Sequence, residues 1–106
     1  MTLDEQYQKT IDDQRAYLLK LQDDFNKACE EIKKRAQEKL KGIPDEDKEK
    51  KEEVLKDQKT ELEGQLHTLK VEVERSTKNT MRKLEAIIRE KEKQILADLE
   101  KQIQAI

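Results

Sequence analysis

The sequence is poor in the residues that fill a globular core. It contains no Trp, one Phe and two Tyr, and hydrophobic residues make up 33% of its 106 residues. A typical globular domain has about 45–50% apolar and about 25% charged residues, whereas 45% of this chain is charged. Such a composition is typical either of disorder or of long helices and coiled coils. The order of the apolar residues along the chain decides between these two classes.

A marked excess of charge of one sign is also absent. The 23 basic and 25 acidic residues give a formal net charge of −2, and the two signs alternate along most of the chain. Proteins that bind nucleic acids usually carry a basic face. The one mildly basic run, residues 33–41, is interrupted by Glu38. We therefore expect no nucleic-acid partner.

Long hydrophobic runs and cysteine pairs are missing as well. The longest apolar run, residues 16–19, is far shorter than the ~20 residues that span a bilayer, so we expect no transmembrane segment. Cys29 is the only cysteine, so it has no intrachain partner for a disulfide. This fits a reducing compartment, and we expect a cytoplasmic, intracellular protein.

The residue combinations that carry enzymatic chemistry are not found. The chain has a single His, His67, and neither a glycine-rich phosphate loop nor a nucleophile motif. Adjacent carboxylates such as Asp12 and Asp13 have Lys or Arg three or four positions away, as solvated helix faces do. We expect no enzymatic activity, no cofactor, no metal ion and no small-molecule substrate.

The sequence does contain apolar residues at helical spacing. Between Leu3 and Ile43 they recur in steps of three or four, with Gln14 filling the one gap. This spacing lines one face of a helix and argues against disorder. Just before it, Thr2 and Glu5 fit a capping box, in which each side chain satisfies a free backbone N–H of the other residue.

The end of this first helix is marked by two residues. Gly42 suits the left-handed residue that often follows a helix, and Pro44 suits the first turn of the next helix. We predict a first helix over residues 3–41, a turn over 42–45 and a second helix over 46–106, within a single helical domain.

A second apolar stripe runs from Leu55 to Ile106 with no Pro and only one Gly, Gly64. It weakens at residues 75–80, where poor helix formers cluster. The short turn requires antiparallel neighbours. The sequence therefore predicts an all-α antiparallel helical hairpin or coiled coil with a long second helix. The alternative is a three-helix bundle broken near residues 75–80.

The two stripes match each other in one antiparallel register. This register pairs Ile32 with Leu55 and sets Gln14 beside Val73. It satisfies most of both stripes together with the short turn, which supports the hairpin. The residues expected in this intrachain seam are Leu18, Leu21, Phe25, Ile32, Leu55, Leu62, Leu66 and Leu69.

In this register the residues after Leu84 have no partner in the first helix. They are nevertheless apolar at helical spacing, with doublets at 87–88 and 95–96 that widen the stripe. We expect them to contact a second copy in a homo-oligomer, with a dimer favoured, or a helical protein partner. Because the pattern continues to Ile106, a fragment of a longer coiled coil is also compatible. The residues expected in this interface are Ile87, Ile88, Ile95, Leu96, Leu99, Ile103 and Ile106.

These features favour a non-enzymatic coiled-coil structural, scaffold or assembly protein that acts by self-association and partner-helix binding. The wide stripe also fits a helical holdase or secretion chaperone for apolar client segments. A third class is the exchangeable lipid-surface helical protein, whose helices usually carry Trp or Phe on the apolar face and Lys and Arg on the polar face. The lack of Trp and the mixed charges fit this class less well.

Overall fold

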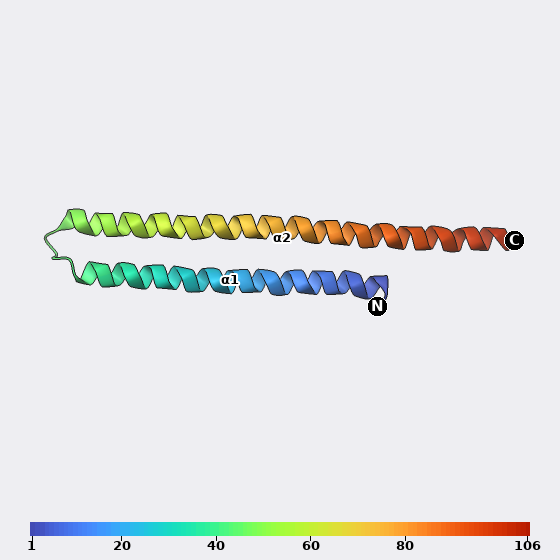
Figure 1. Cartoon of the computed structure of the whole chain (residues 1–106), viewed down its shortest axis with the longest axis horizontal. Coiled ribbons are helices and arrows are strands. Elements are labelled where there is room, and N and C mark those ends of the chain that lie inside the picture. The colour runs from blue at the N-terminus through green and yellow to red at the C-terminus, as the bar shows by residue number, and fades with distance from the viewer. The chain divides into compact units, whose positions relative to one another are not determined.

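The computed structural model describes all residues, 1–106, and contains two α-helices and no strand. Helix α1 spans Leu3–Lys41 and helix α2 spans Lys48–Gln104 (Figure 1). The fold is therefore the predicted all-α helical hairpin with a long second helix. Because α2 continues without interruption through residues 75–80, the three-helix alternative is wrong.

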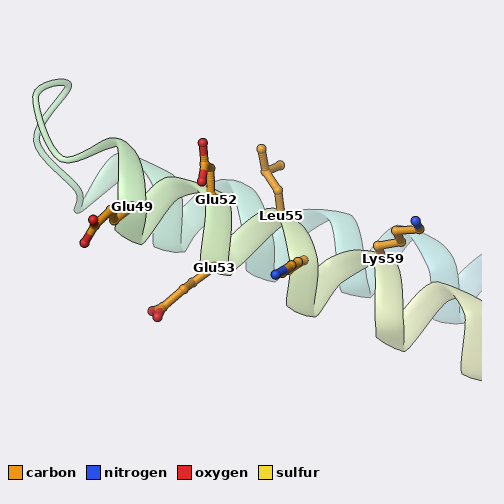
Figure 2. Close-up of a pocket in the computed structure, with 6 residues that line it drawn as sticks. Glu49, Glu52, Glu53, Leu55 and Lys59 are labelled. Carbon is orange, nitrogen blue, oxygen red and sulfur yellow. The ribbon is translucent and has the colours of Figure 1, made fainter.

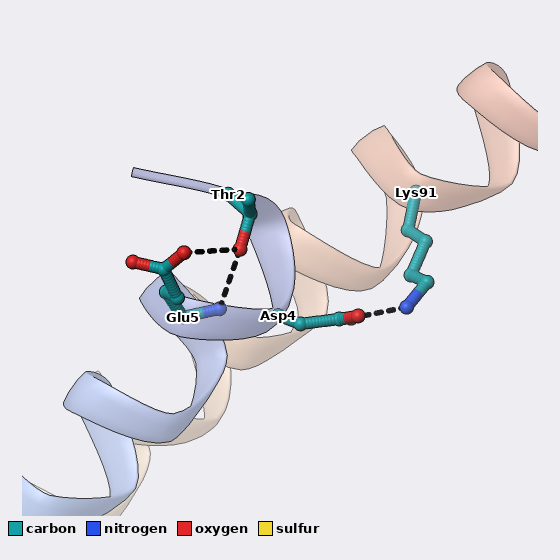
Figure 3. Close-up of polar contacts among 4 residues, drawn as sticks. All are labelled: Thr2, Asp4, Glu5 and Lys91. Carbon is teal, nitrogen blue, oxygen red and sulfur yellow. Dashed lines mark hydrogen bonds and ion pairs between the residues drawn. The ribbon is translucent and has the colours of Figure 1, made fainter.

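The first helix begins at the predicted capping residue. The Glu5 N–H donates to Thr2 Oγ1 at 3.1 Å, and the Thr2 hydroxyl donates to the Glu5 carboxylate at 3.1 Å (Figure 3). The Gln6 N–H then donates to the Thr2 carbonyl at 2.9 Å, which starts the helical ladder. The Glu5 carboxylate thus accepts from the Thr2 hydroxyl, whereas in a standard capping box it would accept from the Thr2 backbone N–H.

The turn between the helices is longer than predicted. Asp47 caps α2, since its Oδ1 accepts the Lys50 N–H at 3.2 Å, and the second helix therefore begins at Lys48 and not at residue 46. At the other side of the turn, the Ile43 N–H donates to the Leu40 carbonyl at 3.2 Å. Gly42 has no positive φ, so the expected left-handed glycine is wrong. A tightened last turn ends α1 without it.

The chain divides into two compact units, each made of both helices. The turn unit comprises residues 18–73, and the terminal unit comprises residues 1–17 and 74–106. In the turn unit, Ile32 and Ala36 are 4% and 6% exposed and are the only buried residues of the chain. They lie against Val54 and Gln58 of α2.

In the terminal unit, polar contacts join the start of α1 to the second half of α2. The Gln14 side-chain oxygen accepts hydrogen bonds from the Ser76 hydroxyl at 2.6 Å and from the Thr80 hydroxyl at 2.8 Å. Asp4 forms an ion pair with Lys91 (Figure 3). The two helix segments run antiparallel, and α2 continues past the first residue of α1 (Figure 1).

The register differs from the sequence-based one by about one helical turn. Gln14 lies opposite Ser76 and Thr80 and not opposite Val73. In the turn unit, Arg35 forms an ion pair with Glu61 at 3.2 Å. The longer turn accounts for the direction of the shift. Each additional turn residue brings a residue with a higher number in α2 opposite a given residue of α1.

The shift is accompanied by a rotation of the face that α2 presents to α1. Six of the eight expected seam residues are buried or half-buried, but Leu55 and Leu66 are 50% and 57% exposed. Val54 and Gln65, each one position earlier, are half-buried in their place. The apolar stripe of α2 is wider than one neighbouring helix can cover, so part of it stays in solvent.

Candidate interaction surfaces

Two depressions, one on α2 alone and one between the two helices, are open to solvent. No group of three or more His, Cys, Asp or Glu residues could hold a metal ion. A shallow depression near the turn is lined by α2 alone, by Glu49, Glu52, Glu53, Leu55, Lys56 and Lys59. In Figure 2, Glu52 and Leu55 project from one side of the helix and Glu53 from the other. These side chains do not converge, so the depression is a solvated helix surface.

The resolved pKa shifts come from exposed ion pairs and not from a reactive site. A hydrogen bond and the charge of Lys51 hold the pKa of Asp45 below its usual value. A hydrogen bond and the charge of Asp23 raise the pKa of Lys27. Both pairs lie on exposed surface, where an ion pair contributes little to stability.

The turn unit carries an apolar groove between the two helices. Phe25 and Cys29 of α1 line it from one side, and Leu55, Leu62 and Leu66 of α2 line it from the other. Its polar rim consists of Asn26, Lys33, Gln58, Lys59 and Glu63. The groove thus contains both of the expected seam residues that the structure places outside the seam. The sequence showed that the apolar stripe of α2 is too wide for one neighbouring helix to cover. It did not show which side of the stripe remains exposed.

The terminal unit carries the second apolar surface. Every residue from Ile88 to Ile106 is exposed, while Ile87 is half-buried. Of the expected interface residues, Ile87 is therefore half-buried within one chain, and the other six are exposed on α2. The Asp4–Lys91 ion pair lies next to the first residue of α1, so α1 offers no cover beyond this point.

The exposed apolar residues do not continue the face that contacts α1. Following Ser76, Thr80 and Ile87 in steps of three or four leads to Lys91 and then to polar residues such as Gln94 and Asp98. The apolar series lies about a quarter of a turn around the helix from this line. We call this series the α2 stripe; its members are Met81, Leu84, Ile88, Ile95, Leu99, Ile103 and Ile106, with Glu92 as the one charged position. All of these residues except the half-buried Leu84 are exposed.

The charges beside the α2 stripe balance. Residues 88–106 contain four basic residues and four acidic residues, so this segment has no net charge. Among these charged residues, Lys93 and Glu90 form the only ion pair along the helix, at 3.9 Å. A surface with an apolar stripe and balanced flanks does not select for a strongly charged partner.

Neither helix contains a stretch long and apolar enough to cross a membrane. Comparison of the chain with protein-family models, with curated proteins and with solved structures found no match. The two exposed apolar surfaces and the charges beside them are the features of this chain suited to binding a partner.

Proposed function

We propose that this chain is a non-enzymatic coiled-coil assembly protein that self-associates and binds partner helices through the α2 stripe. The observation that carries the proposal is the exposure of this stripe beyond the first residue of α1. Ile88, Ile95 and Leu99 are each about half exposed, and Ile103 is 69% exposed. Fully burying a large aliphatic side chain contributes roughly 1.5–3 kcal/mol, so covering these half-exposed residues contributes part of that amount each toward the cost of association.

The small core of the hairpin supports the same proposal. Only Ile32 and Ala36 are buried, and thirteen large apolar residues of this chain remain exposed to water. Small scaffolds with too little core commonly gain stability by oligomerising. Large exposed apolar patches on soluble proteins mark interaction surfaces.

The spacing of the stripe favours a helix as the partner. Its members recur every three or four residues along α2, so they form one narrow row on the helix surface. A second helix can pack its own apolar row along this line, as in coiled coils and in helix-in-groove complexes. A bound strand or loop would match only some of these positions.

Sedimentation equilibrium between about 1 and 200 μM protein tests the proposal. The wild-type chain is expected to exceed the monomer mass with increasing concentration, because the stripe is then shared between copies. The double variant Ile95→Gln/Leu99→Gln should remain monomeric. Ala97→Gln changes the opposite side of the same helical turn and is the matched control, expected to behave as wild type. A wild-type chain that stays monomeric throughout contradicts self-association.

A further inference from the structure

We infer that the partner of the α2 stripe is the α2 stripe of a second copy, running antiparallel and related by a two-fold axis between residues 93 and 94. This inference rests on the proposed function and adds the identity of the partner and its direction. In this arrangement Ile88 of one copy packs against Leu99 of the other.

The spacing of the stripe is symmetric along α2. From Met81 to Ile106 the steps are 3, 4, 4, 3, 4, 4 and 3 residues, counting Glu92 as a member. This series reads the same in both directions, so a reversed copy places its stripe residues level with those of the first. The resulting pairs are Met81 with Ile106, Leu84 with Ile103, Ile88 with Leu99, and Glu92 with Ile95.

The single charged member of the stripe also favours the antiparallel direction. In a parallel pair in register, Glu92 would face Glu92 of the second copy between two apolar layers. Like charges brought together at such a position are destabilising. In the antiparallel pair, Glu92 faces Ile95, and its carboxylate can turn outward to water.

The charges that flank the stripe are complementary in the same arrangement. Arg89 and Glu100 each directly follow a stripe residue and so lie on the same flank of the helix. In the antiparallel pair, Arg89 of one copy and Glu100 of the other are offset by two residues, which is about 3 Å along the helix axis. On the opposite flank, Lys91 and Asp98 meet with the same offset. The two-fold axis repeats each pair, giving four contacts between opposite charges.

Within one chain, Arg89 and Glu100 do not contact each other. The two residues are eleven positions apart on one helix, too far to touch each other, and both are exposed. Lys91, in contrast, already contacts Asp4. The Arg89–Glu100 pair is therefore the one whose charges can be exchanged without disturbing the contact between α1 and α2.

A charge-exchange experiment tests the pairing. Arg89→Glu and Glu100→Arg are each expected to raise the dissociation constant of the dimer about 3- to 10-fold at low salt. The double variant Arg89→Glu/Glu100→Arg should return to within about twofold of wild type, since opposite charges then face each other again across the interface. Lys101→Glu, on the side away from the stripe, is the charge-matched control and should have little effect.

A distance between two copies tests the direction independently. A spin label is placed on Gln104→Cys in a Cys29→Ser background, and pulsed electron paramagnetic resonance measures the separation of the two labels. The antiparallel pair places them about 32 Å apart along the axis, since residue 104 lies level with residue 83. Labels at one level, with no rescue by the double charge variant, would overturn the antiparallel pair and leave self-association standing. A protein that stays monomeric would overturn the proposed function as well.

Discussion

At the scale of single residues, a polar side chain defines the register of the terminal unit. Gln14 occupies a position in the stripe of α1 where every neighbouring step is apolar, and its oxygen accepts hydrogen bonds from both Ser76 and Thr80. An apolar row tolerates slippage by one turn, because any aliphatic residue can replace another. A half-buried amide with two specific donors does not, since a slip would leave these groups without partners.

The substitution Gln14→Leu is accordingly expected to lower the free energy of unfolding by about 1–2 kcal/mol, because two half-buried hydroxyls lose their acceptor. The triple variant Gln14→Leu/Ser76→Ala/Thr80→Ala should recover most of this loss, since the whole layer is then apolar. Urea unfolding followed by circular dichroism measures both. If Gln14→Leu alone is as stable as wild type, the amide does not define the register.

At the scale of the elements, the sequence predicted the helices better than the way in which they meet. The capping residue Thr2 and the long apolar rows were sufficient to place α1 and most of α2. The start of α2 was misplaced because three acidic residues, 45–47, are all suited to a helix N-terminus, and only the bond from Lys50 identifies Asp47 as the cap. The longer turn that results gives the direction of the shift in register.

The candidate surfaces were predictable to different degrees. The exposed apolar stretch after Leu84 follows from counting, because α1 is shorter than α2 whatever the register. The groove that contains Leu55 and Leu66 was missed, since it depends on which side of a wide stripe faces α1. That choice is made by packing over the whole turn unit, where Val54 lies beside Ile32, and not by any local motif.

The glycine inside α2 gives a prediction at this scale. Gly64 lies in the middle of a helix, and a Cβ added there would meet no atom within 4 Å apart from its chain neighbours and the nearby backbone of α2. Gly64→Ala is therefore expected to raise the free energy of unfolding by about 0.5–1 kcal/mol through the lower entropy of the unfolded chain. Thermal unfolding at a fixed low concentration measures the change. A loss of stability would reveal a contact at Gly64 that one chain does not contain.

At the scale of the whole molecule, most of the chain consists of two helices paired with each other, whereas the end of α2 is exposed. Each unit joins α1 to α2, but every residue from Ile88 onward is exposed, and the Asp4–Lys91 ion pair joins this segment to α1. Most helical stability in proteins comes from packing of an apolar face, and the apolar residues of this segment are exposed within one chain. The end of α2 should therefore be ordered mainly by association.

Amide hydrogen exchange at several protein concentrations tests self-association through the α2 stripe most directly. Amides of residues 92–104 should be weakly protected in dilute solution and become more protected, by at least about tenfold, as the concentration rises through the dissociation constant. Amides near Ile32, inside the turn unit, should change much less. Protection of residues 92–104 that does not depend on concentration would contradict self-association through this surface.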